Sequence, residues 1–209
     1  MKTPVRAIWR SGAYLAGLAG VLFCSATSAA DDLTVQAKRA GHAVAVEARA
    51  TLTAPADLIW STLTDYDHLS DFIPGMRASK IIGRRGPAAI VEQQGDAGFL
   101  IFSYAINVVV ESAEYPPNLI EIHVVSGNLR QLDGAYRLTA GEEGGTWVLS
   151  WSGLIEPTLP VPSFLTVDLM RRNVEAQFSG MVAEIERRQT APEVAEASRS
   201  EPLVSAAAW

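Results

Sequence analysis

The stretch SFLTVDLMRRNVEAQFSGMVAEIERR, residues 163–188, carries one long helical pattern with no proline and a single glycine, Gly180. Its apolar residues recur at spacings of three and four, as in a helix that buries one face; they are Val167, Met170, Val174, Phe178, Met181, Val182 and Ile185. Asp168, Arg171, Arg172, Glu175, Glu184 and Glu186 take the remaining positions. The sequence therefore predicts a long amphipathic helix, about 39 Å in length at 1.5 Å per residue.

Six stretches of extended character precede this helix. They cover residues 77–83, 88–94, 99–112, 119–126, 129–139 and 146–155. The connectors, such as residues 95–98 and 127–128, are short and rich in turn-forming residues. Short connectors of this kind favour hairpins between consecutive strands. The sequence therefore predicts an antiparallel meander.

Further upstream, residues 43–52 alternate between apolar and polar side chains and predict a first strand. Pro55 suits the first position of a helix, because it lacks an N–H that would be unpaired there. We expect one short helix from this point to about Leu63 and a second from Tyr66 to Phe72, which Pro74 ends.

Together these elements predict an α+β fold. Its curved seven-stranded antiparallel sheet has one face to cover, and the long C-terminal helix is the element able to cover it. The sheet must therefore wrap around that helix, with the two short helices after the first strand. Such an arrangement leaves an apolar concave space, which is the usual site for a small molecule.

The stretch APADLIWSTLTDYDHLSDFIPGM, residues 54–76, resembles the opening of the polyketide cyclase/dehydrase and lipid-transport superfamily. This START-like (SRPBCC) superfamily has the helix-grip fold, and the nearest resemblance is to its coenzyme Q-binding branch. GNLRQLDGAYRL (127–138), GTWVLSW (145–151) and PVP (160–162) support the resemblance, which spans residues 43–188. It implies a helix-grip domain in a group that includes lipid carriers, quinone carriers and aromatase/cyclases. Tyr136 stands where the family often has a tryptophan before an arginine, which adds a hydroxyl at this place.

Strand parity identifies the side chains that face the long helix. The inward sets are Leu100, Phe102, Tyr104, Ile106, Val108 and Val110; Ile120, Ile122 and Val124; Leu132, Gly134, Tyr136 and Leu138; and Trp147, Leu149 and Trp151. Buried tyrosine and tryptophan need a partner for their polar tips, which a ligand, the backbone or water can supply. We predict that the ligand is lined by Phe102, Tyr104, Ile122, Tyr136, Trp151, Phe178 and Met181.

Support for catalysis or a metal is thin. His68 has three aspartates nearby, but such a loop is more often a solvated cap than a metal site. His123 and Glu121 resemble a base and its orienting carboxylate, yet both are expected on the outer face. We assign no catalytic residue, no metal ligand and no cofactor.

Composition and charge narrow the function further. The 209 residues are 48% hydrophobic and 19% charged, as in an ordinary globular domain. The net charge of −6 disfavours a nucleic-acid partner, and a single cysteine excludes a disulfide framework. The expected partner is a hydrophobic small molecule; transient contact with a membrane and the oligomeric state are left open.

The first 30 residues have the three parts of a secretory signal peptide: a basic start, an uncharged apolar run at 12–24, and small residues at 25–30. The apolar run is too short to cross a bilayer about 30 Å thick. We expect cleavage near Ala29 or Ala30 and a periplasmic location. Cleavage removes Cys24 together with three cations and no acidic residue, so the net charge changes from −6 to −9.

The expected organisation is a signal peptide at 1–30, a polar lead at 31–42, the START-like domain at 43–188 and a disordered tail at 189–209. The leading interpretation is a non-enzymatic carrier for a lipid, isoprenoid quinone or similar apolar molecule. The alternatives are a polyketide-type aromatase/cyclase or dehydratase, in which Tyr104, Tyr136 or Arg130 polarises a carbonyl, and a periplasmic protein-interaction module.

Overall fold

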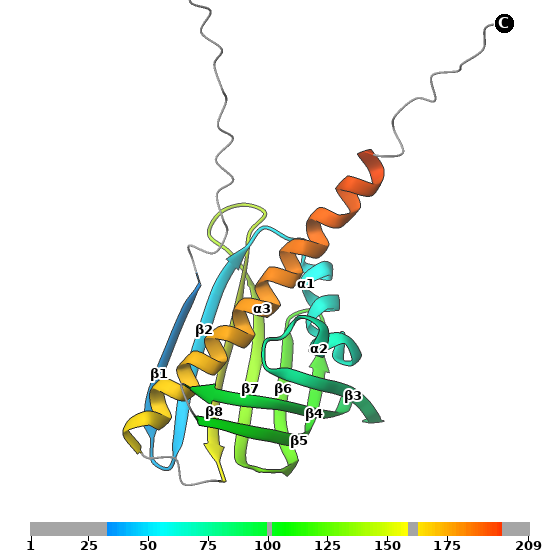
Figure 1. The fold of residues 1–209 in the computed structure, drawn as a ribbon. Helices are drawn as coiled ribbons and strands as arrows, with labels where there is room; N and C mark the ends of the chain where they lie inside the picture. Colours follow the sequence, from blue (N-terminus) through cyan, green and yellow to red (C-terminus); the bar gives the residue numbers. More distant parts are fainter. Residues whose placement is uncertain (1–32, 100–101, 159–162, 198–209) are drawn as a thin grey trace, which may run out of the picture.

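The computed structural model describes residues 33–99, 102–158 and 163–197, in which an open antiparallel sheet curves around a long helix (Figure 1). The strands are β1 (Thr34–Ala40), β2 (Ala43–Leu52), β3 (Met76–Arg85), β4 (Ala88–Phe99), β5 (Phe102–Tyr115), β6 (Leu119–Gly127), β7 (Leu129–Ala140) and β8 (Trp147–Pro157). The helices are α1 (Ala56–Leu63), the 3₁₀ turn η2 (Tyr66–His68), α2 (Leu69–Phe72) and α3 (Ser163–Ala197).

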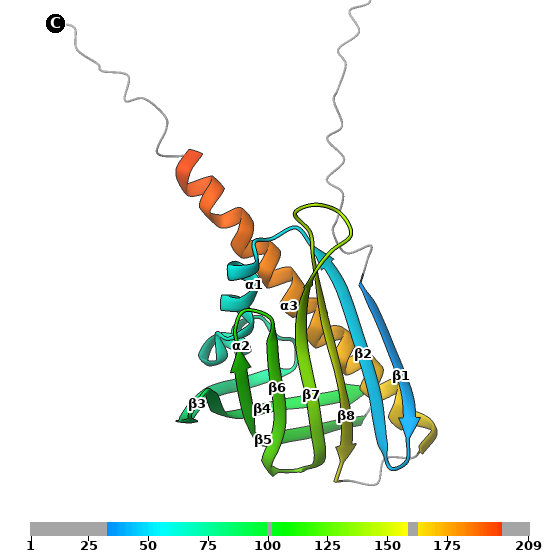
Figure 2. The ribbon, with the colours of Figure 1, turned by 180° about the vertical axis from the view of Figure 1, so that it is seen from behind.

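The sheet has the strand order β1-β2-β8-β7-β6-β5-β4-β3. Strands β3 to β8 form the expected meander, and β2 joins it by pairing with β8, with Ala48 opposite Trp151. α3 lies across the concave face, whereas the view from behind shows the convex face without a helix over it (Figures 1 and 2). The α+β helix-grip architecture predicted from the sequence is confirmed.

The number of strands was underestimated, because the sheet has eight strands and not seven. The additional strand, β1, lies within residues 31–42, where we expected only a polar lead. It turns back at Gly41, whose φ is 65°, and pairs with β2 along its whole length. As an edge strand it exposes much of its length, so its sequence lacks the strong alternation that identifies a half-buried strand.

Residues 95–98 were predicted to be a turn, but they continue β4. A Cβ on Gly95 would lie 2.6 Å from the carbonyl oxygen of Gly75, and the Asp96 N–H donates to that same oxygen at 2.8 Å. Glycine is therefore required here because the loop before β3 passes close to the strand. β4 and β5 pair as far as Phe99 and Phe102, and residues 100–101 lie outside the described residues.

The C-terminal helix is longer than expected, because α3 continues to Ala197 where we predicted a disordered tail from residue 189. The alanines and glutamates around Pro192 are good helix formers and continue the helical backbone past the proline. The proposed signal peptide and residues 198–209 lie outside the described residues. No helix in the described part of the chain has both the length and the apolar character needed to cross a membrane.

The predicted apolar face of α3 packs into the core. Met170, Val174, Phe178, Met181, Val182 and Ile185 are all buried, together with Leu169. The densest contacts of α3 are with β1, β2, β4 and α1, with α2 also in contact. α3 therefore rests mainly on the two ends of the sheet and on the short helices.

The closest approach between α3 and the short helices is at Gly180. A Cβ there would lie 2.7 Å from the carbonyl oxygen of Phe72 and 2.5 Å from the Pro74 ring. The glycine in the helix pattern is thus explained by packing, since only a residue without a side chain lets the α2–β3 loop touch the helix backbone.

A second attachment lies further along α3, where Arg188 donates to Asp65 at 2.8 Å and stands over the Phe72 ring at 5.5 Å. Glu184 accepts from both Arg187, at 2.6 and 2.7 Å, and Arg188, at 2.7 Å. Although the helix pattern placed Glu184 on the solvent face, its side chain is only 7% exposed. Hydrogen bonds from Arg187, assisted by Arg188, outweigh burial and lower the pKa of Glu184 to about 2.

Acid should weaken this attachment. A carboxylate whose pKa is lowered by folding contributes stability above its unfolded pKa, near 4.5, and loses it as the pH falls toward 2. We expect Glu184→Gln to lower the free energy of unfolding at pH 7 by about 1–2 kcal/mol, because charge-assisted hydrogen bonds are lost. It should also flatten the pH dependence of that free energy between about pH 5 and pH 2, measured by urea denaturation.

The matched control is Glu175→Gln on the same helix, where Glu175 pairs with Arg171 at 2.7 Å and is 45% exposed. We expect this change to cost less than about 0.5 kcal/mol, as for exposed helix pairs. An acid sensitivity that survives unchanged in Glu184→Gln would show that Glu184 does not carry it.

Candidate functional site

A cavity with two adjoining lobes lies between α3 and the concave face of the sheet. The first, here called the hairpin lobe, lies beside the β4–β5 hairpin and holds about 810 Å³ of space outside the protein atoms, its opening included. The second, the helix lobe, lies beside η2 and α2 and holds about 870 Å³ on the same measure.

The two lobes share a waist, because six residues line both of them: Met76, Gln93, Leu132, Ile155, Val174 and Gln177. Four of the six are apolar, and the two glutamines come from β4 and from α3. A single elongated molecule can therefore contact both lobes through a mostly apolar passage with one amide on either side.

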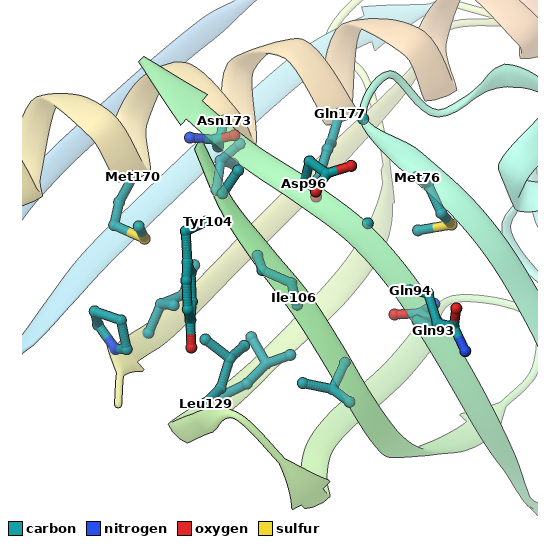
Figure 3. A pocket seen from close by; sticks show the side chains of 18 residues that line it. Met76, Gln93, Gln94, Asp96, Tyr104, Ile106, Leu129, Met170, Asn173 and Gln177 are labelled. Carbon is teal, nitrogen blue, oxygen red and sulfur yellow. The ribbon is translucent and has the colours of Figure 1, made fainter. Parts of the chain in front are cut away.

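The hairpin lobe has more amide and carboxylate side chains in its lining than the helix lobe. Asn173 and Gln177 project from α3 toward the β4–β5 hairpin, with Asp96 below Gln177 (Figure 3). Among the described lining residues Asp96 is the charged one, and Arg77 pairs with it at 3.1 Å. The end of the cavity beside the hairpin therefore presents amide groups and an ion-paired carboxylate.

The helix lobe is lined mainly by apolar side chains: Leu63, Leu69, Ile73, Val110, Ile120, Ile122, Trp151, Phe178 and Met181. Its polar groups beyond the waist are the hydroxyls of Tyr66, Ser112 and Tyr136. A hydroxyl surrounded by apolar walls is where a ligand's own polar group is fixed in orientation.

Six of the seven residues predicted to line a ligand face this cavity. Tyr104 lines the hairpin lobe, and Ile122, Tyr136, Trp151, Phe178 and Met181 line the helix lobe. Phe102 begins β5, but its side chain lies outside the described residues. Strand parity and the helical stripe therefore locate the concave wall correctly, while contact with a ligand stays a prediction.

The two predicted tyrosines differ in how their hydroxyls are used. The Tyr104 hydroxyl donates to the backbone oxygen of Asn128 at 2.7 Å, so the protein itself satisfies it. No hydrogen bond from the described residues reaches the Tyr136 hydroxyl, and burial raises the pKa of Tyr136 to about 12. Tyr136 therefore keeps its proton at neutral pH, and its hydroxyl can donate a hydrogen bond to a bound molecule.

Sequence reasoning missed Tyr66, Gln93 and Gln177. Gln93 follows Ala89 and Val91 at the inward positions of β4, and Gln177 stands beside Phe178 on the buried face of α3. A polar residue within an apolar set was the signal for both. Tyr66 lies in a three-residue turn, which is too short for any periodicity to reveal its direction.

The Trp151 ring lies close to two glycines, Gly134 on the neighbouring strand β7 and Gly153 on its own strand β8. Gly134 of β7 pairs with Gly153 of β8. A Cβ on Gly153 would be 2.9 Å from the Trp151 ring and 2.9 Å from the carbonyl oxygen of Asp133, and one on Gly134 would be 3.1 Å from the ring. The glycines therefore leave the space that lets the indole form part of the cavity wall.

The residues weighed for catalysis lie elsewhere. The ring of exposed His123 is 2.8 Å from Asp133 and does not use Glu121 as its partner. His68 contacts Asp65 at 2.6 Å, and Arg130 pairs with Glu156 at 2.8 Å, with Arg130 mostly exposed. Within the described residues, no group of three or more His, Cys, Asp or Glu is placed to hold a metal ion. None of these side chains lines either lobe.

The family model for polyketide cyclase/dehydrase and lipid transport matches residues 43–189. The chain therefore belongs to this family, as the motifs at 54–76 and 127–138 indicated. Comparison with curated proteins gave no significant match.

Solved structures share the fold at low identity. A START superfamily protein from Mycobacterium smegmatis has a TM-score of 0.59 at 16% identity, covering 68% of this chain and 97% of its own. The Zhui aromatase/cyclase from Streptomyces sp. R1128 has a TM-score of 0.58 at 18% identity, covering 69% and 94%. A STAR-related lipid transfer protein from Xanthomonas axonopodis has a TM-score of 0.59 at 11% identity, covering 75% and 94%.

The close packing of the Trp151 ring against Gly153 leads to a prediction. In Gly153→Ala the new methyl group must displace the indole or the Asp133 carbonyl, so we expect a loss of about 1–3 kcal/mol in unfolding free energy, as for an overpacked core. The near-ultraviolet circular dichroism of the tryptophans should change as well.

Gly83→Ala in β3 is the control, because a Cβ there meets nothing within 4 Å. Alanine in place of this strand glycine should leave stability equal or slightly higher. Equal behaviour of the two variants would contradict the role given to Gly153.

Proposed function

We propose that this protein is an exported binding or carrier protein for an apolar small molecule, such as a lipid or isoprenoid quinone. The observation that carries the proposal is the cavity between α3 and the sheet, whose two lobes meet at an apolar waist. Membership of a family that includes lipid transport supports it. The fold that the chain shares with a STAR-related lipid transfer protein is consistent with the same role.

Desolvation is the driving force in this proposal. Each buried CH₂ contributes about 0.8 kcal/mol, so ten buried carbons contribute roughly 8 kcal/mol before the entropic cost of association. Met76, Met170 and Met181 line the cavity, and their flexible side chains adapt to chains of different shape. The lining therefore suits a molecule with an extended hydrocarbon part.

The quinone in this proposal comes from the resemblance to the coenzyme Q-binding branch. The periplasmic location comes from the signal-peptide pattern of residues 1–30. In an exported carrier the cavity would protect an apolar molecule from water between two membranes or between a membrane and an enzyme.

A polyketide-type cyclase or dehydratase is the second candidate. The hydroxyl of Tyr136, which faces the helix lobe with no partner among the described residues, favours it because such a group can polarise a substrate carbonyl. Arg130, also considered for this role, lies outside the cavity lining. Loss of turnover in Tyr136→Phe with retained binding would favour this candidate over the carrier.

The first test blocks the waist of the cavity with a larger side chain. Val174 of α3 is buried and lines both lobes. We expect wild-type protein purified from its own host to yield a lipid-like molecule on solvent extraction and mass spectrometry. Val174→Trp should reduce the amount recovered at least about tenfold, because the indole occupies the passage that the hydrocarbon needs.

Val125→Trp is the matched control, since Val125 is 52% exposed on β6 and outside both lobes. It should retain the bound molecule. Circular dichroism and thermal melting establish that both variants fold, and Val174→Phe serves if the larger change prevents folding. Wild-type protein that yields no molecule and binds no apolar probe would overturn the proposal.

The second test concerns export. Expressed in a Gram-negative host, the protein should be recovered from the periplasmic fraction with an N-terminus at Ala30 or Asp31, as determined by N-terminal sequencing. Deletion of residues 2–24 should leave it in the cytoplasm. A wild-type chain that keeps Met1 and stays in the cytoplasm would show that the leader interpretation is wrong.

A further inference from the structure

The helix lobe contains a hydroxyl that the protein leaves without a hydrogen bond. Tyr66 is only 4% exposed, and its Oη has no hydrogen-bond partner among the described residues. Ser112 and Glu114 are polar neighbours, but neither is placed with hydrogen-bond geometry to Tyr66. A buried hydroxyl left in this state costs about 1–3 kcal/mol, so its retention requires an explanation.

The Tyr136 hydroxyl lies in the same lobe and also has no partner among the described residues. Tyr66 comes from η2, and Tyr136 from the middle of β7. Ser112, which lies near Tyr66, is on β5, and β6 is the one strand between β5 and β7. At 4.8 Å per strand, the backbones of β5 and β7 are roughly 10 Å apart. The two phenols therefore reach one lobe from different elements of the fold.

From this arrangement we infer that the helix lobe receives the oxygen-bearing end of an uncharged ligand, with Tyr66 and Tyr136 donating hydrogen bonds to its carbonyl-type oxygens. The inference rests on the proposed function and narrows it to neutral oxygenated apolar molecules, held in one direction. The hydrocarbon remainder of such a ligand extends toward the mostly apolar waist.

The charges around the cavity agree with a neutral acceptor. Glu114, next to Tyr66, and Asp96, at the hairpin lobe, are both carboxylates. They pair with Arg84 at 3.4 Å and Arg77 at 3.1 Å on the exposed side. A carboxylate or phosphate placed in the cavity would face these acidic groups and lose its hydration, whereas a ketone or quinone oxygen would not.

Both phenols carry their protons at neutral pH, as donation requires. Burial, followed by the charge of Glu114, raises the pKa of Tyr66 far above its usual value. Burial alone raises the pKa of Tyr136 to about 12. Both hydroxyls can therefore donate a hydrogen bond to a ligand oxygen.

The test compares two probes of similar size, 2-acetylnaphthalene and 2-ethylnaphthalene, in which a carbonyl group of the first takes the place of a CH₂ group of the second. Dissociation constants are measured by equilibrium dialysis with the purified mature protein. We expect the ketone to bind about tenfold more tightly than the hydrocarbon, as a hydrogen bond in a desolvated site provides. Tyr66→Phe and Tyr136→Phe should each reduce this preference to about threefold or less, with the affinity for 2-ethylnaphthalene unchanged or increased.

Tyr115→Phe is the matched control, because Tyr115 is 46% exposed and lies outside both lobes. It removes a phenol hydroxyl of the same kind without changing the cavity. This variant should retain the tenfold preference.

A second measurement tests whether the Tyr66 hydroxyl is free in the ligand-free protein. If it is unbonded, Tyr66→Phe melts at the same temperature as the wild type or higher, because an unsatisfied polar group has been removed. A lower melting temperature would show that the hydroxyl bonds to Ser112 or Glu114, which would overturn its role as a ligand donor.

The outcomes separate the inference from the proposed function. Equal affinity of the two probes for the wild type, or a preference that survives in both tyrosine variants, would overturn the inference and leave the apolar carrier standing. Failure of both probes to bind the wild type would count against the carrier itself, and the inference would fall with it.

Discussion

The packing of one helix against a sheet that curves away from it determines the rest of this structure. α3 meets the protein most closely at the ends of the sheet and at the short helices, through β1, β2, β4 and α1. At Gly180 its backbone touches the α2–β3 loop, and no side chain larger than hydrogen fits between them. The helix is thus held at the rim, with β6, β7 and β8 behind it in Figure 1 and in front of it in Figure 2. A straight helix cannot fill a strongly curved sheet, so the space beneath it follows from the architecture and not from weak packing.

The walls of that space are shaped by glycines as much as by large side chains. Gly134 and Gly153 let the Trp151 ring lie close to the sheet, and Gly95 lets the loop before β3 pass close to β4. The cavity is therefore bounded by rigid backbone contacts, while methionines and aliphatic side chains line its interior. Rigid boundaries with an adaptable lining suit molecules that share a size and a polarity more than a detailed shape.

Long periodic patterns made the fold predictable, and their absence explains what was missed. The stripe on residues 163–188 identified α3, and alternation placed Tyr136 and Trp151 on the concave face. β1 was not recognised because an edge strand exposes many of its side chains and has little pattern to show. Glu184 was expected in solvent because its partner network depends on Asp65, which lies 123 residues away from Arg188 in the sequence. Only the tertiary structure brings these charges together, and the same holds for Tyr66.

The hydroxyls of the helix lobe connect stability with ligand binding. A polar group that is buried and unpaired costs about 1–3 kcal/mol in the empty protein. A ligand that binds only the folded chain returns a similar amount, about 2.7 kcal/mol at a concentration of one hundred times its Kd. The two magnitudes are comparable, so a molecule that satisfies Tyr66 and Tyr136 offsets the cost that the empty cavity imposes. Because the lobe is bounded by α3, η2 and the four central strands β5 to β8, the same molecule also joins elements whose direct contacts lie mainly at the rim. The core around α3 therefore stabilises the domain without a ligand, and a bound ligand adds stability through its contacts in the helix lobe.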